Sequence, residues 1–177
     1  EDAADSPLVK DKNQPEISVG IVRHLNDLDS LVPLLEPARQ AHKLAAEAVR
    51  FFRASIFEHH NEEEKDLFPA VLANANAGEE RNKAQEAVDR LVREHRHLES
   101  VWAKLQPQLE SIAHGGAGDV DVEAIRMLVT NYQAHARYEE DVFLPLAKTV
   151  LGRQGEHMAA LGLRIHMRHT PVQVTPF

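Results

Sequence analysis

One short phrase occurs twice in this sequence, in residues 59–69 and again in residues 135–145. Each copy reads His-x-x-x-Glu-Glu, followed by two further positions, two bulky apolar residues and Pro. Residues four apart lie on one face of an α-helix, so each copy can direct an imidazole and a carboxylate toward the same point. Two helices of this kind that face each other would form a metal site.

The hydrophobic pattern predicts an all-α protein. Apolar residues recur at spacings of three and four in long stretches, and no alternation typical of a β-strand extends beyond a few residues. The expected helices run from Ile17 to the prolines at 33 and 37, from about Pro37 to the Asn/Gly segment 74–78, from about 79 to 113, and from about 122 to 150. Short loops between them predict an antiparallel up-down-up-down four-helix bundle.

The chain is expected to form one domain with two short flanking segments. Residues 1–15 are predicted to be a polar N-terminal lead-in, because they carry two prolines and no sustained period. Residues 16–151 are predicted to form the metal-binding bundle. Residues 152–177 are predicted to form a short accessory helix and a tail.

The composition narrows the classes of partner and of metal ligand. The chain has no cysteine, which excludes disulfides, thiolate metal sites and cysteine nucleophiles. A formal net charge of -8 argues against nucleic acid or an anionic membrane as the main partner. No apolar run approaches the roughly 18 to 20 residues that span a bilayer, and no leader pattern is present. We therefore expect a cytoplasmic protein, although the numbered chain begins at Glu1, which leaves open a removed segment.

Each expected helix carries one histidine in the middle of its apolar stripe, namely His24, His59, His95 and His135. In an antiparallel hairpin, residues at equal height are equidistant from the turn. The midpoint of 59 and 95 is 77, and the midpoint of 95 and 135 is 115, and both positions lie in Gly-containing loops. Three histidines are therefore expected at one level of the bundle. The midpoint of 24 and 59, at 41 or 42, lies past Pro37 and fits the expected turn less well.

A single histidine on an apolar face is more often an ordinary core residue than a metal ligand. Four on four stripes, beside two carboxylates, are costly to bury unless a metal coordinates them. The stripes select His59 over His60, which lies about 100° around the helix and is expected in a supporting or surface position. The predicted metal ligands are His24, His59, Glu63, His95, His135 and Glu139.

Imidazoles and carboxylates favour iron, manganese or zinc over calcium or copper(I). Two carboxylates from opposing helices suit a bridge between two ions about 3.5 to 4 Å apart. A single zinc ion needs only about four ligands. A site of two iron ions is therefore the sharper hypothesis, with manganese or zinc as alternatives.

These residues resemble the hemerythrin family, in the form of the bacterial hemerythrin-like HHE cation-binding domain. The resemblance covers about residues 17–150 and rests on His24, the two repeated phrases and Glu94-His95-Arg96. It implies a four-helix bundle around a non-haem di-iron centre, bridged by an oxo or hydroxo group and two carboxylates, with oxygen bound at an open iron position. Oxygen carriers of the family have a second histidine four residues after that of the third helix, where this chain has Glu99. Glu99 is either a possible seventh ligand or a surface residue without a role.

Three functions are consistent with this sequence. The first is a protein that binds or senses oxygen or a related small molecule, or that handles iron. The second is a di-iron enzyme with ferroxidase or peroxide-decomposing activity, although the Glu-x-x-His motif typical of ferritin-like enzymes occurs only at residues 94–97, on a polar face. The third is a structural or zinc-binding bundle. No nucleophile triad or phosphate-binding loop is present, so no catalytic residue is predicted.

Overall fold

The computed structural model describes residues 14–116 and 119–153, and every element in these ranges is helical. The all-α class is therefore confirmed. Most of the predicted lead-in, and all but two residues of the predicted accessory segment, lie outside the described residues. The chain divides into two units, residues 1–41 and residues 42–177, which are described in turn.

In the first unit, α1 (Gln14–Leu31) is followed by the 3₁₀ turn η1 (Val32–Leu34) and by the start of α2 (Leu35–Glu62). Leu31 and Leu35 on either side of η1 both keep right-handed helical angles. The helix therefore ends before Pro33 as predicted, but the chain does not reverse there. The reason is that proline fits the first turn of a helix, where its missing N–H needs no partner.

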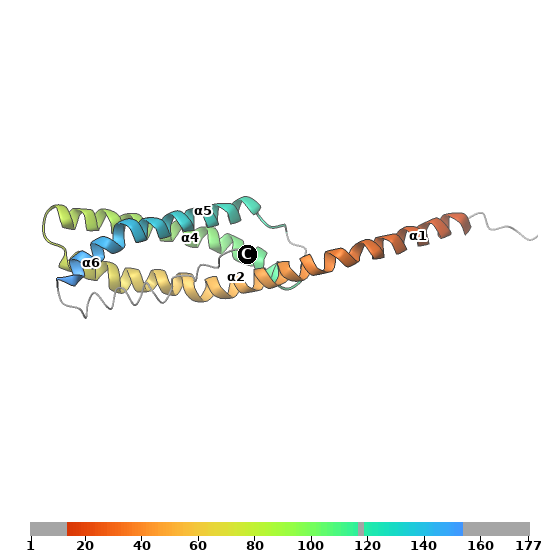
Figure 1. Cartoon of the computed structure of the whole chain (residues 1–177), viewed down its shortest axis with the longest axis horizontal. Coiled ribbons are helices and arrows are strands. Elements are labelled where there is room, and N and C mark those ends of the chain that lie inside the picture. Colours follow the sequence, from red (N-terminus) through yellow and green to blue (C-terminus); the bar gives the residue numbers. More distant parts are fainter. Residues whose placement is uncertain (1–13, 117–118, 154–177) are drawn as a thin grey trace, which may run out of the picture. The chain divides into compact units, whose positions relative to one another are not determined.

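Within its described residues, the second unit contains three long helical segments, and neighbouring segments run antiparallel (Figure 1). The first segment is α2 from His42 on, with η2 (Glu63–Leu67) and α3 (Phe68–Asn74). The second is α4 (Glu79–Ala113), and the third comprises α5 (Val122–Tyr138), η3 (Glu139–Phe143) and α6 (Leu144–Gly152). α4 packs against α3, α5 and η3, and α3 packs against α6. A four-helix bundle stays a prediction, because α1 belongs to the first unit.

The two turns of the second unit lie where the sequence placed them. Gly78 precedes α4 with a φ of 99°, and Gly115 follows α4 with a φ of 82°, both in the region that favours glycine. Asp121 caps α5, since its carboxylate accepts a hydrogen bond from the Ala124 N–H at 2.9 Å. None of the helices within the described ranges is both long enough and apolar enough to cross a membrane.

A polar layer crosses the second unit between two apolar clusters. One cluster, around α3 and α6, contains Phe68, Leu91 and Phe143 among its buried residues. The other contains Leu98 and Trp102. On α4 the buried His95 lies between Leu91 of the first cluster and Leu98 of the second. The apolar clusters therefore hold the polar layer on both sides and keep its side chains out of water.

Candidate metal centre

The two copies of the repeated phrase adopt the same unusual backbone. Each contains a five-residue π-helical turn, η2 in the first copy and η3 in the second, in which the Phe68 and Leu144 N–H groups bond to carbonyls five residues back. Proline follows at once in both copies, as Pro69 and Pro145. A proline ring clashes with the carbonyl four residues back in a regular α-helix, and the wider turn relieves that clash. In both copies the π-helical turn thus lies where it relieves the clash of the proline that follows.

The π-helical turn changes which side chains share a face. One extra residue in a turn rotates everything that follows by about 100° relative to a regular helix. Phe68, five residues after Glu63, is buried together with Leu67. A prediction based on an uninterrupted α-helix could not assign both sides of this turn correctly.

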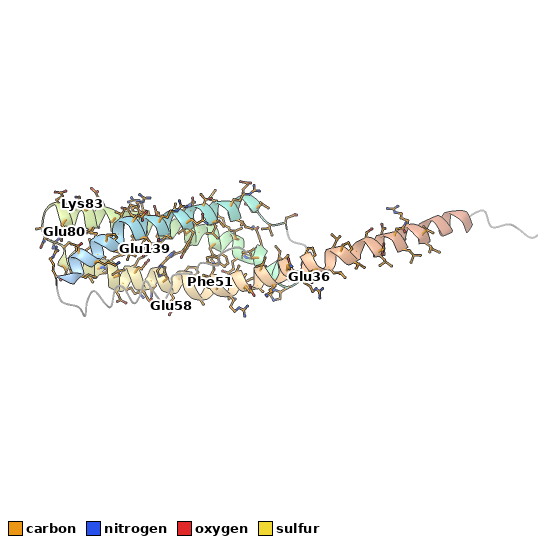
Figure 2. The ribbon with its side chains drawn as sticks, viewed as in Figure 1. Glu36, Phe51, Glu58, Glu80, Lys83 and Glu139 are labelled. Atoms are coloured by element: carbon orange, nitrogen blue, oxygen red, sulfur yellow. The ribbon has the colours of Figure 1, made fainter. Side chains whose placement is uncertain are left out.

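Six buried polar side chains form the centre of the polar layer. They fall into two groups, each with ligand atoms within 4.8 Å of one another, and neither group contains an exposed residue. The buried Glu139 lies among the side chains between the helices, whereas Glu58 lies on the outer side of α2 (Figure 2). The first group is His60, His95 and His135, and the second is His59, Glu63 and Glu139.

The three imidazoles of the first group are all oriented in the same way. The Nδ1 atom of His60 lies 2.9 Å from Glu99, that of His95 lies 2.8 Å from Glu64, and that of His135 lies 2.9 Å from Glu94. The opposite Nε2 atoms are buried and have no hydrogen-bond partner among the described residues. A carboxylate that accepts from Nδ1–H fixes the tautomer and leaves the Nε2 lone pair free to bind a metal.

Burial keeps the His60 and His95 imidazoles neutral. It lowers the pKa of His60 to about 2, with further contributions from the neighbouring histidines. It also lowers the pKa of His95 to about 4, although the hydrogen bond to Glu64 acts in the opposite direction. The metal-binding form of histidine is the neutral one, so both imidazoles are ready to bind at neutral pH.

Glu63 lies between the two groups. One of its oxygens is 3.3 Å from His59 Nε2, and the other is 3.2 Å from His95 Nε2. Burial raises the pKa of the Glu63 carboxyl well above its usual range, and the charge of Glu139 and a hydrogen bond to it raise the pKa further. A cation placed between the two carboxylates would offset both effects. The arrangement is suited to a carboxylate bridge between two ions.

The structure brings together five of the six predicted ligands, His59, Glu63, His95, His135 and Glu139, and their role as ligands stays a prediction. His24 lies in the first unit, where its side chain is 80% exposed and 3.8 Å from Asp27, and its role as a ligand also stays a prediction.

Glu99 has both carboxylate oxygens engaged, one with His60 and the other with Arg96 at 2.7 Å. Among the described residues it belongs to neither metal-sized group. In this structure it is a hydrogen-bond partner of a candidate ligand, and its role as a possible seventh ligand stays a prediction.

His60 belongs to the buried cluster, although the sequence predicted a supporting or surface position for it. Its side chain is 1% exposed, and its ring stacks on that of His95 with the centroids 3.7 Å apart. The available signal was the doubling of the phrase itself, with His59-His60 followed four residues later by Glu63-Glu64. Adjacent histidines on one helix differ by about 100°, so they can face two different ions.

A family model describing the hemerythrin HHE cation-binding domain matches residues 20–147. This match spans well over half of the chain, so the protein belongs to the hemerythrin family, and its domain is one that binds metal cations. Comparisons with curated proteins and with solved structures gave no significant match.

Proposed function

We propose that this protein holds two iron ions in the polar layer and uses them to bind or sense oxygen or a related small molecule, or to handle iron. The observation that carries the proposal is the convergence of three buried Nε2 atoms that have no hydrogen-bond partner in the described part of the chain, on imidazoles whose Nδ1 atoms are held by carboxylates. Buried polar atoms without partners are costly in a folded protein, and a metal ion would satisfy all three at once.

The residues divide naturally between two ions. His60, His95 and His135 would hold one ion, and His59, Glu63 and Glu139 would hold the other. Glu63, with an oxygen directed to each group, would bridge them. Iron bound there would supply redox and oxygen-binding chemistry, while the apolar clusters on both sides exclude bulk water.

We further propose that α1 forms the fourth helix of an antiparallel bundle, with His24 as a ligand of the second ion. Ile21 and Leu28 share the stripe of His24 by helical spacing, and both are exposed in this structure. An apolar stripe on a helix is stable in water only when something covers it. A metal that gains a ligand from α1 would link metal binding to the burial of this stripe.

Metal analysis of the purified full chain, with optical spectra taken under argon and in air, tests the proposal. About two irons per chain, with charge-transfer bands that respond reversibly to oxygen, would support a carrier or a sensor. Irreversible consumption of Fe²⁺ or peroxide would instead support the enzyme alternative. One zinc ion, or no metal after growth with added iron, would overturn the proposal.

Two histidine variants provide a matched comparison, one of a buried residue and one of an exposed residue. His135→Ala should abolish binding of at least one ion, because it removes a buried Nε2 of the three-imidazole group. His97→Ala should retain the metal, since His97 is exposed and its ring lies 3.0 Å from Asn131. Hydrogen exchange in α1, measured with and without iron, tests the fourth helix, and equal exchange in both states would exclude His24 as a ligand.

A further inference from the structure

Outside the candidate ligands, a second layer of charged side chains surrounds the three-imidazole group. The layer consists of Glu64, Glu94 and Glu99, which hold the three Nδ1 atoms, and of two arginines of α4. Arg90 donates to Glu94 at 2.7 Å and so supports His135 alone. Arg96 donates to Glu99 at 2.7 Å and also to Glu64, and so supports two histidines.

The contacts around Arg96 form a closed ring across two helices. His60 of α2 is held by Glu99 of α4, and His95 of α4 is held by Glu64 of η2. Each helix thus supplies the carboxylate that holds the imidazole of the other. Arg96 joins the free ends of the two carboxylates, and the stacked rings of His60 and His95, inclined by 8°, close the ring on the inner side.

Arginine is suited to this position because its planar guanidinium can donate to two carboxylates in fixed directions. A carboxylate held on one oxygen by Arg96 has only the other oxygen to offer to the imidazole. That arrangement selects the Nδ1–H tautomer and fixes the ring plane, so Nε2 is directed toward the other members of its group. The Arg96 side chain is about half exposed, so its role can be removed without opening a cavity in the core.

We propose that Arg96 is a positioning residue that fixes the tautomer and orientation of His60 and His95 through Glu99 and Glu64. The identity of the bound ion rests on the proposed function above, but the positioning itself does not. It is a property of the metal-free chain and can be measured there.

The test uses the full chain without metal, with ¹⁵N-labelled histidine, and NMR correlation of the ring nitrogens to read the tautomers. In the wild type, His60 and His95 should both be Nδ1–H tautomers. In Arg96→Gln both should become mixtures, whereas His135, which is supported through Arg90, should not change. Arg93→Gln is the matched control, because Arg93 is an exposed arginine of the same helix and has no contact with Glu64 or Glu99 among the described residues.

Metal affinity and two further variants test the positioning role independently. Affinity for Co²⁺, used as the probe metal, should fall about 10- to 100-fold in Arg96→Gln and stay unchanged in Arg93→Gln. Arg96→Lys should recover only part of the loss, since an ammonium group lacks the planar fork. Glu99→Gln should disturb the tautomer of His60 and leave that of His95 in place, which separates positioning from general loosening of the fold.

Unchanged tautomers and unchanged Co²⁺ affinity in Arg96→Gln would overturn the proposal, as would equal losses in Arg93→Gln. If the tautomers respond as expected but the wild type never takes up iron, the positioning role stands and the proposed function fails. If iron binds and the tautomers do not respond, the proposed function stands and the positioning role fails.

Discussion

The two copies of the repeated phrase share one backbone conformation but contribute different numbers of side chains to the polar layer. Both form a helix, a five-residue π-helical turn and a second helix that begins with proline in its first turn. The first copy places three buried candidate ligands in the polar layer, His59, His60 and Glu63, whereas the second places two, His135 and Glu139. The position equivalent to His60 in the second copy is Ala136.

The difference shows how one phrase can serve two ions. In the second copy the residues four apart are divided between the two groups: His135 belongs to the three-imidazole group and Glu139 to the other. In the first copy the added His60 reaches the three-imidazole group, so His59 and Glu63 are left for the second group. The outer carboxylates differ as well, since Glu64 holds His95 while its counterpart Glu140 is exposed.

Deletion of Asp66, an exposed residue of η2, should have the largest effect, because it shortens the π-helical turn to a regular one. A regular α-helix at this point would rotate the donors of α2 by about 100° relative to the buried Phe68 and Val71. We expect loss of metal binding and a loss of stability of several kcal/mol, on the order of a disrupted core. Metal content and denaturant unfolding measure the two effects.

Deletion of Asp141 in η3 sharpens the comparison, because it displaces two donors instead of three. The control is deletion of Ala77, which lies exposed in the loop before α4, because it shortens the chain by one residue without changing a helical turn. If the Ala77 deletion proved as damaging as the Asp66 deletion, the effect would come from chain shortening in general and not from the π-helical turn.

His60→Ala removes the donor that only the first copy has, and it should have the next largest effect. One of the two ions should be lost, because the three-imidazole group would keep only His95 and His135. The protein should stay folded, since the change also removes a buried Nε2 without a hydrogen-bond partner. Full retention of both ions in His60→Ala would return His60 to the supporting role that the regular helical register assigned to it.

Much of the second unit could be predicted from the sequence, because local rules determine it. The apolar stripes identified α2, α4 and α5, and the positive φ angles of Gly78 and Gly115 occur where the histidine midpoints required turns. The same stripes identified His59, His95 and His135 as neighbours. Periodicity is a property of short segments, so it survives without knowledge of the tertiary packing.

The remaining features depend on geometry that periodicity does not contain. A π-helical turn precedes the proline in both copies, and its rotation of the following residues cannot be read from a regular period. The burial of His60 depends on how α2 is rotated against α4, because Glu99 of α4 forms a hydrogen bond with the His60 ring. The connection at Pro33 is helical, because proline is as compatible with the start of a helix as with the end of one.

The stability of the metal-free protein should depend on pH in two opposing ways. The imidazoles cause a loss of stability toward low pH, the acid limb, and Glu63 causes a loss with increasing pH, the neutral limb. Burial lowers the pKa of His60 to about 2 and that of His95 to about 4, so below about pH 6.5 the unfolded chain binds more protons than the folded one. Stability should therefore fall with decreasing pH, by about 1.4 kcal/mol per pH unit for each imidazole. The pKa of Glu63 is raised, so above about pH 4.5 it contributes a loss of stability with increasing pH.

Chemical denaturation from pH 4 to pH 8 separates these limbs. His60→Gln should flatten the acid limb and leave the neutral limb in place, and Glu63→Gln should do the opposite. Excess metal should reverse the neutral limb, because ligands must lose protons to bind a cation. If neither substitution changes its limb, the imidazoles and the carboxyl are not buried as described.

The smallest expected effect concerns the outer carboxylates, Glu64 in the first copy and Glu140 in the second. Glu64→Gln keeps the size of the side chain but removes the charge that accepts from His95 Nδ1 and from Arg96. The tautomer of His95 is then less strongly selected, so metal affinity should fall about tenfold while the fold stays intact. Glu140→Gln should change nothing, since Glu140 is exposed and no described contact joins it to an imidazole. Competition for Co²⁺ with a chelator of known affinity resolves a tenfold difference. Equal affinities of the two variants would mean that the outer layer does not distinguish the copies, and that His60 alone makes them unequal.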